Sequence, residues 1–414
     1  MKKQLLQLLV GAFGCLFTAV NPLSAQIWTP TSAPTNAWSS VASSADGSQL
    51  VAAVNGGGIY ASTDSGATWI LTNAANASWT CVASSADGTK LAAVSAGSPV
   101  LGGWPMVNIS TNSGATWFTC NVVTAIPVGS SGHWSAVNLS ADGTKLVVAE
   151  NSSAFSGNQF PGSIYTSTNS GATWNSGPSG YWSSVASSAD GTKLVAAEYA
   201  PKSKGMGIYT TTNSGATWTA TGPLYPSLTW TCIASSADGA KLVAAVNGGI
   251  YTSTDSGATW AQAANGLSGA FSTYVASSAD GSKLVASFIG GGGGIYTSTD
   301  SGATWTQTTN GPSGALVASS ADGSMLVAAV NGGGIYTSQT TPAPVLAITP
   351  SSDNLAFSWL VPSTNFVLQQ CSDLCAANWT DVTNNTPALN LANLQYQVVL
   401  PLPAGNAFYR LKTP

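Results

Sequence analysis

Hydrophobic and polar residues alternate along most of this chain in short runs, and the runs recur in a fixed order. In the fifth repeat WTCIASS begins at Trp230, KLVAAV at Lys241 and GIYTS at Gly249. Alternation over about four to eight residues, bounded by turn residues, is typical of β-strands. Each repeat is therefore expected to contain three such strands, with a fourth beginning in the Ala-Thr-Trp that follows GIYTS.

The turn Ala-Asp-Gly separates the first and second strands of every repeat. It occurs seven times at intervals of 41 to 55 residues, and its aspartates are Asp46, Asp87, Asp142, Asp190, Asp238, Asp280 and Asp322. This spacing suits a four-stranded unit. One four-stranded sheet cannot bury both of its faces alone, whereas radial stacking of several sheets buries them. The repeats therefore predict an all-β fold, a β-propeller.

The last repeat and the N-terminal segment complement each other. The last repeat ends in GGGIYTSQTTPAP, which supplies a third strand but no fourth. The segment QIWTP at residues 26–30 resembles a fourth strand, because Trp28 precedes Val41 by 13 residues just as Trp69 precedes Val82. The N-terminal segment is therefore expected to close the ring as the outer strand of a seven-bladed propeller.

The motif Ser/Thr-x-Asp/Asn-x-Gly-x-Thr-Trp follows the third strand in six repeats. Its tryptophans are Trp69, Trp117, Trp174, Trp218, Trp260 and Trp305. On this motif, residues 27–340 resemble the Asp-box (BNR) repeat β-propellers, which include the sialidases. The resemblance implies the propeller fold but no single function, because propellers of this kind serve as enzymes, receptors and assembly factors.

The acid of the motif varies in a way that indicates a structural role. It is Asp at positions 64, 255 and 300 but Asn at positions 112, 169 and 213. Asparagine retains an oxygen that accepts backbone hydrogen bonds in a turn, but it lacks the charge of a catalytic or metal-binding carboxylate. The glycine is expected to adopt a positive φ and the tryptophan to pack between strands. The Ala-Asp-Gly aspartates are expected to be turn residues as well.

Sialidases are similar to one another in three arginines that hold the substrate carboxylate, a tyrosine nucleophile with a nearby glutamate, and a catalytic aspartate. The expected propeller contains no arginine, since the single arginine of the chain is Arg410. Lysine does not offer the bidentate geometry of a guanidinium group. The sequence therefore argues against sialidase activity.

Function is expected where the repeats depart from their own pattern. Eight residues after the turn aspartate, five repeats have Val, Ser or Phe, but the third and fourth have Glu150 and Glu198, the only glutamates of the protein. The residue before the first strand is His133 or Tyr181 in the same two repeats. These departures concentrate unusual polar and aromatic residues in neighbouring repeats.

The longest loops between second and third strands belong to repeats two, three and four. In an antiparallel meander these loops lie on the face opposite the Ala-Asp-Gly turns, and loops on a rigid scaffold are where binding usually occurs. A ligand-binding patch is expected on this face. Its residues are Trp104, His133, Glu150, Tyr181, Glu198 and Tyr199, with Phe155, Phe160, Lys202 and Lys204 nearby.

Two functions fit this patch. Aromatic side chains beside acids suit a carbohydrate or a protein ligand, which predicts a non-catalytic recognition or adhesion protein. The alternative is a glycoside hydrolase with Glu150 and Glu198 as acid and base, which requires carboxyl groups about 5 to 10 Å apart. Equivalent points on neighbouring blades are about 10 Å apart, and solvent-facing glutamates lack the environment that separates their pKa values. Binding is therefore favoured, and an ordinary surface with solvated glutamates is the remaining interpretation.

Residues 1–25 have the pattern of a secretory signal peptide, with Lys2 and Lys3 before an apolar run and a small-residue cleavage point after Ala25. Cys15 is a poor match to a lipoprotein site. No other segment is apolar for about twenty residues, so no transmembrane segment is expected. The protein is expected to be secreted or held at the cell surface, with an extracellular glycan or protein as its ligand.

Composition limits the other partners. Without residues 1–25 the chain has nine basic and fifteen acidic side chains, a net charge of −6. Clustered lysine and arginine are lacking, so nucleic acid is not expected as a partner. His133 is the single histidine, and no His/Cys cluster has the spacing of a zinc site, so no metal or cofactor is expected.

The chain changes character after the propeller, which is expected to span residues 26–340. A linker-like stretch at 341–345 precedes LAFSWLV, FVLQQC, YQVVLPL and AFYRLKT, and these runs predict a small all-β, sandwich-like domain at 346–414 that is a candidate attachment module. Cys371 and Cys375 are close enough in sequence to pair in an oxidising compartment. Cys81 and Cys232 occupy matching positions in two repeats and are expected to be small buried side chains.

Overall fold

The computed structural model describes residues 27–97, 106–120, 122, 131–155, 158–199, 207–222, 229–246, 249–263, 271–289, 293–339, 346–350, 353–360, 367–372, 379–382, 387–390, 395–403 and 407–412. The expected signal peptide lies outside these ranges. The described residues form β-strands and turns, and no helix capable of spanning a membrane occurs among them. The expectation of an all-β chain is confirmed for this part of the sequence.

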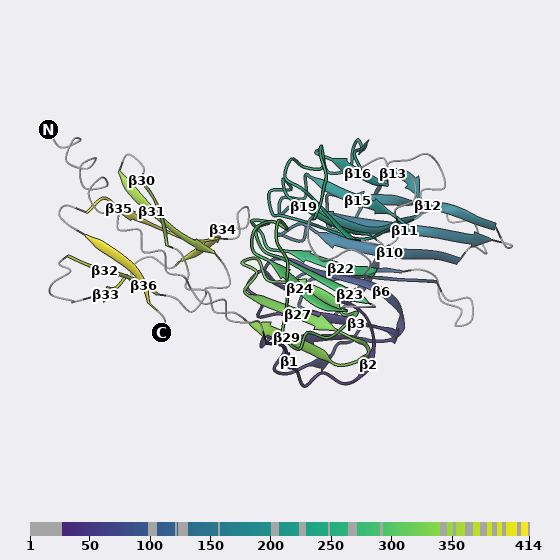
Figure 1. The fold of residues 1–414 in the computed structure, drawn as a ribbon, viewed down its shortest axis with the longest axis horizontal. Helices are drawn as coiled ribbons and strands as arrows, with labels where there is room; N and C mark the ends of the chain where they lie inside the picture. Colours follow the sequence, from purple (N-terminus) through teal and green to yellow (C-terminus); the bar gives the residue numbers. More distant parts are fainter. Residues whose placement is uncertain are drawn as a thin grey trace.

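The repeats fold into antiparallel runs of four strands (Figure 1). In the fourth repeat these are β14 (Trp182–Ser187), β15 (Leu194–Glu198), β16 (Ile208–Thr211) and β17 (Thr219–Ala220), in that spatial order. Three other repeats form four-stranded sheets of the same order. The third repeat contributes β10 (Ser131–Leu139), β11 (Leu146–Phe155), β12 (Asn158–Ser167) and β13 (Asn175–Gly180), and the fifth contributes β18 (Trp230–Ser235), β19 (Leu242–Val246), β20 (Gly249–Ser253) and β21 (Ala261–Gln262). The sixth contributes β22 (Phe271–Ser277), β23 (Leu284–Ile289), β24 (Gly294–Ser298) and β25 (Thr306–Gln307).

The first two repeats keep this order within one larger sheet. Their strands are β2 (Asn36–Ser43), β3 (Leu50–Gly57), β4 (Ile59–Ser62) and β5 (Ile70–Leu71), followed by β6 (Ala77–Ser84), β7 (Leu91–Ser95), β8 (Val107–Ser110) and β9 (Phe118–Cys120). Pairing of Asn55 in β3 with Ser78 in β6, and of β2 with β28 (Asn331–Gly333), joins them into a nine-stranded sheet. Short bridges of this kind tie adjacent repeats together.

The N-terminal segment completes the sheet of the seventh repeat, as the sequence predicts. Strand β1 (Thr29–Pro30) pairs with β29 (Ile335–Gln339), and the sheet continues through β27 (Met325–Ala329) to β26 (Leu316–Ser319). Trp28 is buried, and its indole Nε1 donates a hydrogen bond of 2.9 Å to the hydroxyl of Thr308 in the sixth repeat. The two ends of the repeat array are therefore joined by strand pairing and by packing.

A closed ring of backbone hydrogen bonds connects the seven Ala-Asp-Gly turns. The amide of Ala45 donates to the carbonyl of Ala86 at 2.8 Å, each following alanine bonds the next in the same way, and Ala321 returns to Ala45 at 2.8 Å. The turns thus lie together on one face, here called the turn face. The connections between second and third strands leave the opposite ends of the same strands, on what is here called the loop face.

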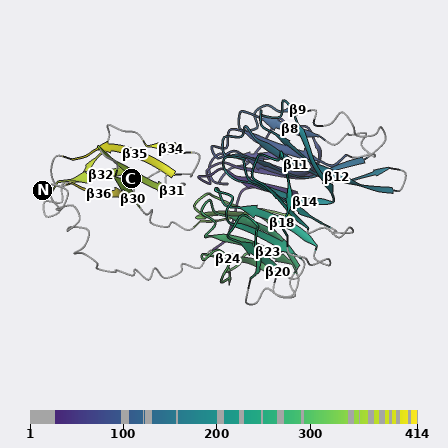
Figure 2. The same ribbon diagram turned by 90° about the horizontal axis from the view of Figure 1, so that it is seen from above.

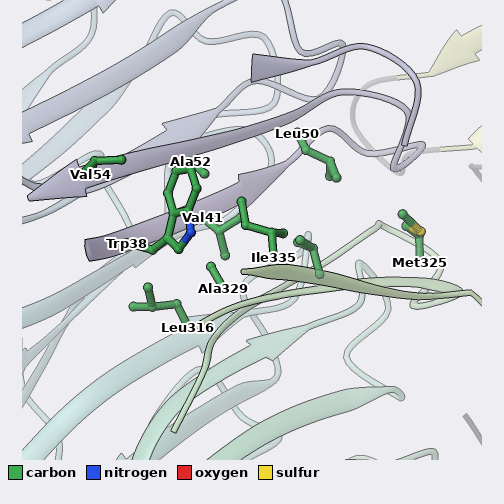
Figure 3. Close-up of a cluster of buried hydrophobic side chains, with 10 residues drawn as sticks. Trp38, Val41, Leu50, Ala52, Val54, Leu316, Met325, Ala329 and Ile335 are labelled. Atoms are coloured by element: carbon green, nitrogen blue, oxygen red, sulfur yellow. The ribbon is translucent and has the colours of Figure 1, made fainter. Parts of the chain in front are cut away.

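Apolar side chains from adjacent repeats fill the space between the sheets. Figure 3 shows one such cluster, in which Trp38 and Val54 of the first repeat meet Leu316 and Ala329 of the seventh. The first-strand tryptophans Trp38, Trp79, Trp134, Trp182 and Trp230 are all buried. Removing a buried tryptophan from such a core costs about 3 to 5 kcal/mol, so these positions are strongly constrained.

The six motif turns share one geometry whether the acid is Asp or Asn. Oδ1 of Asp64 accepts the amide of Thr68 at 2.8 Å, and Oδ2 accepts its hydroxyl at 2.6 Å. Asn112 accepts the amide of Thr116 at 2.8 Å and donates from Nδ2 to its hydroxyl at 2.9 Å. The expected structural role is therefore confirmed.

Two details of the motif differ from expectation. The motif glycines have φ between 82° and 89°, as expected, but the serine before each glycine also has a positive φ, from 53° to 59°. The fourth strand begins after the motif tryptophan, at Ile70 in the first repeat, rather than at Ala-Thr-Trp. The bonds from the acid to the threonine hold that tripeptide in the turn and delay the strand.

The C-terminal residues form two small sheets beside the repeats (Figures 1 and 2). One contains β30 (Ala347–Pro350), β31 (Asn354–Leu360), β35 (Gln395–Pro401) and β34 (Ala388–Asn390), and the other contains β33 (Thr380–Asp381), β32 (Val367–Cys371) and β36 (Phe408–Lys412). Phe357, Trp359, Leu368, Val398 and Leu400 form their common core. The domain boundaries stay predictions, as does the Cys371–Cys375 pair, because Cys375 lies outside the described residues.

Candidate functional site

Glu150 and Glu198 occupy equivalent places beside buried tryptophans. Glu150 in β11 is the register partner of Trp134, and Glu198 in β15 is the register partner of Trp182. In the first and fifth repeats the same place opposite tryptophan is taken by Val54 and Val246. The sequence alignment of the repeats therefore located a true structural equivalence.

Both glutamates are buried, and the interpretation of solvated strand-end residues is wrong. Glu150 is 7% exposed and Glu198 is 5% exposed. The residues at this position in the other repeats include Val54, Ser95, Val246 and Phe288, and all four are buried. The sequence carried this signal, because a position that accepts valine or phenylalanine faces the interior.

Burial raises the pKa of both carboxyl groups, because the charged form loses hydration. One backbone N–H partly offsets the effect in each case, that of Ser163 for Glu150 and that of Tyr181 for Glu198. The amide of Tyr181 lies 3.5 Å from Oε1 of Glu198, which is a long hydrogen bond. This single long hydrogen bond therefore compensates only weakly for the hydration that the carboxyl of Glu198 loses on burial.

An aromatic pair lies beside each glutamate. Trp134 and Tyr165 meet edge to face with ring centroids 5.6 Å apart, and Trp182 and Tyr209 do so at 5.2 Å. Burial raises the pKa of both tyrosines, and the neighbouring glutamate raises it further. The third and fourth repeats thus each contain a glutamate, a tryptophan and a tyrosine in one arrangement.

Two glycines allow the strands of the third repeat to approach these carboxyl groups. Gly162 in β12 pairs with Gly180 in β13. A Cβ atom at Gly180 would lie 3.0 Å from the ring of Trp182 and 3.2 Å from Oε1 of Glu198, and one at Gly162 would collide with the carbonyl of Glu150. The indole Nε1 of Trp182 is buried and has no hydrogen-bond partner among the described residues. This site therefore holds polar groups with incomplete internal pairing.

The remaining patch residues lie nearer the surface. His133 is exposed, Tyr181 is half-buried and Tyr199 is 51% exposed. The amide of Tyr199 donates to the carbonyl of Tyr181 at 2.7 Å, which fixes the start of one loop against the entry to the first strand. The structure thus brings Tyr181, Glu198 and Tyr199 together at the loop face of the fourth repeat.

Part of the predicted patch lies outside the described residues. This holds for Trp104, Lys202 and Lys204. The backbones of Phe155 and Phe160 belong to β11 and β12, whose pairing extends to Phe155 with Asn158. Among the described residues, β11 and β12 are longer than the equivalent strands of the second and fourth repeats, and Figure 1 shows them projecting beyond the body on the loop side.

The setting of the two glutamates limits what they do chemically. Each carboxyl lies beside the aromatic pair of its own sheet; burial raises its pKa, and a hydrogen bond from one backbone amide lowers it in part. Two carboxyl groups that are both buried present little surface to a glycoside. Within the described part of the chain, no three His, Cys, Asp or Glu residues are grouped to hold a metal ion.

A central channel of about 490 Å³ runs between the first strands of the repeats. Cys81 and Cys232 line this channel. Their side chains were expected to be buried, but each is half-buried. Their thiols donate to the carbonyls of Val137 and Val275 in the following repeats at 3.8 and 3.7 Å, and burial raises the pKa of both. The two cysteines therefore act as links between repeats.

Comparison with known proteins supports the fold. No protein-family model matches the chain, and no curated protein does. Among solved structures, "YCF48 bound to D1 peptide" matches with a TM-score of 0.54 and 16% identity, covering 78% of this chain and 97% of that one. The fold is that of a β-propeller. YCF48 from Cyanidioschyzon merolae matches this propeller with a TM-score of 0.53 and 18% identity, covering 76% of this chain and 99% of that one.

Proposed function

We propose that this propeller is an exported, non-catalytic recognition protein that binds a protein segment through the loop face of repeats two to four. The observation that carries the proposal is the burial of Glu150 and Glu198 at a position where three other repeats have valine and the remaining two have Ser95 and Phe288. Valine satisfies the fold at this position, whereas a buried carboxyl group costs stability unless it is well paired. A stability cost found in two of the three repeats with long loops supports a role in binding.

The ring architecture belongs to the same proposal. We infer seven blades of the Asp-box type, closed by β1. The support is the ring of seven backbone hydrogen bonds, and the six motif turns with one geometry. A rigid ring of this kind holds loops from adjacent blades at fixed separations, which suits recognition of an extended ligand.

A protein ligand has more support than a carbohydrate. One of the similar solved structures is described as bound to a peptide. Tyr199 directly follows Glu198 in the chain and is 51% exposed, so its ring offers an apolar contact at the loop face. Aromatic anchors of this kind are enriched at protein interfaces. Carbohydrate binding remains the second candidate, since the same side chains stack on sugars.

Binding of the purified full chain to arrays of glycans and of extracellular peptides tests this proposal. Glu198→Gln keeps the shape of the side chain and removes its ionisation, and Thr229→Ala, in the fifth repeat, is a control outside repeats two to four. We expect a ligand whose signal falls in the Glu198 variant and not in the control. Glycosidase activity lost in both Glu150→Gln and Glu198→Gln would instead establish the hydrolase.

Export is proposed from residues 1–25 alone. N-terminal sequencing of the mature protein tests it, and a mature chain that begins at Gln26 is the expected result. A mature chain that retains Met1 would refute the proposed export signal.

A further inference from the structure

The seven Ala-Asp-Gly turns provide an internal comparison of exposure on the turn face. Five of their aspartates are exposed, namely Asp87, Asp142, Asp190, Asp238 and Asp280. Asp322 in the seventh repeat is only 8% exposed, and Asp46 in the first is half-buried. The alanines behave alike, because Ala45 and Ala321 are buried while the five others are half-buried. Something therefore covers the two turns where the seventh repeat meets the first.

The covering residue comes from the C-terminal sheets. Tyr396 in β35 packs against the cluster formed by Ala45 and Ala321. Burial raises the pKa of its hydroxyl, and the negative charge of Asp46 raises it further, which places the two groups close together. Tyr396 is also the register partner of Trp359, and both belong to the core cluster of the small sheets. The tyrosine thus connects the core of the C-terminal part to the propeller.

The sequence of the turns changes at the same two repeats. The third residue after the turn aspartate is Lys90, Lys145, Lys193, Lys241 or Lys283 in the five exposed turns, but Gln49 and Met325 in the covered ones. Nζ of Lys283 donates to the carbonyl of Asp322 at 2.8 Å, so the lysine links one turn to the next. Met325 is buried. Gln49 is half-buried, and its Nε2 donates to the carbonyl of Asp87 at 2.7 Å, so it keeps the link to the next turn. A lysine ammonium in place of the buried Met325 would lose its hydration, which explains the uncharged residue there.

We propose that the turns at residues 44–49 and 320–325 form the docking surface of the C-terminal sheets, with Tyr396 as its anchor. The argument rests on the exposure difference among equivalent turns, on the contact made by Tyr396, and on the exchange of lysine for the buried Met325. Docking holds the seam where the first and last repeats meet. It also leaves the loop face free, so that a ligand there approaches from the side opposite the C-terminal part.

Carboxyl footprinting of the full chain tests this proposal. A water-soluble carbodiimide with a small amine labels exposed aspartates, and mass spectrometry compares their rates. We expect Asp46 and Asp322 to be labelled at least about fivefold more slowly than the five other turn aspartates. Tyr396→Ala should raise both rates towards those of the other turns, whereas Val399→Ala, an exposed residue of the same strand, should leave them unchanged.

A second variant acts from the propeller side. Met325→Lys restores the lysine of the other repeats and leaves the core of the small sheets untouched, and we expect it to raise the labelling of Asp46 as well. The five other turn aspartates report in each variant whether the propeller is intact. Equal labelling of all seven aspartates in the unaltered chain would overturn the proposal. So would unchanged protection of Asp46 and Asp322 in both Tyr396→Ala and Met325→Lys.

Discussion

Replacement of Glu198 by valine should stabilise the protein. Glu198 is 5% exposed, stands opposite buried Trp182, and accepts, among the described residues, only a long hydrogen bond of 3.5 Å from Tyr181. Valine occupies the same register at Val246, opposite buried Trp230, so the backbone already accommodates it. Exchange of a buried, poorly paired polar group for a fitting apolar one is worth about 1 to 3 kcal/mol.

The gain should depend on pH in a defined direction. Burial raises the pKa of Glu198 above its value in the unfolded chain, so the native chain binds a proton there that the unfolded chain has already lost. The wild-type protein therefore loses stability as pH rises from the unfolded-state pKa through the raised folded-state pKa. The Glu198→Val variant lacks this loss, so its advantage should be smallest in acid and largest above that window.

Urea unfolding of the full chain at several pH values measures both effects, since the midpoint shifts with stability at constant slope. Val246→Glu is the reverse control and should destabilise the protein, most strongly at higher pH. A Glu198→Val variant that is less stable than wild type, or whose advantage is independent of pH, would refute the reasoning. Either result would mean that the carboxyl is favourably paired in the folded chain.

Three further expectations concern the scaffold. Trp28→Ala should lower the free energy of unfolding by about 3 to 5 kcal/mol, because it removes a buried ring that joins the N-terminal segment to the sixth repeat; tryptophan fluorescence in urea measures it. Asp300→Asn should change the free energy of unfolding little and Asp300→Ala more, because hydrogen bonds with Thr304 hold the pKa of Asp300 at about 2 and asparagine makes equivalent bonds. The stability that the ionised Asp300 contributes to the wild-type protein should be lost as pH falls towards about 2, which an acid titration of both variants and the wild type measures. Gly257→Ala should cost about 1 to 2 kcal/mol by the same urea assay, since its φ is 88°.

Much of the fold was predictable because equivalent positions can be compared between the repeats of one chain. The match of Trp28 to Trp69 in spacing predicted the pairing of β1 with the last sheet, and the exchange of Asp64 for Asn112 predicted a turn role for the motif. Both rest on local chemistry, in which a turn oxygen or a packing ring has the same function in each copy. Such features need no knowledge of distant contacts.

The environment of the site was harder to predict from the chain. Valine and phenylalanine at the equivalent positions signal the burial of Glu150 and Glu198, but the close approach of Gly180 to Glu198 joins different strands and repeats. The contact of Tyr396 with Ala45 joins residues far apart in sequence, and no pattern of neighbouring residues around Tyr396 predicts it. Tertiary packing therefore decided the properties that matter most for function.

The affinity for the strongest ligand found on the arrays tests the central claim most directly. Tyr199 and Ile289 are equivalent residues of the fourth and sixth repeats, and they are exposed by 51% and 48%. If the loop face of repeats two to four binds the ligand, Tyr199→Ala should weaken binding by about tenfold or more, while Ile289→Ala leaves the dissociation constant unchanged. Equal effects of the two substitutions, or no binding to any array by the wild-type chain, would contradict the proposed function.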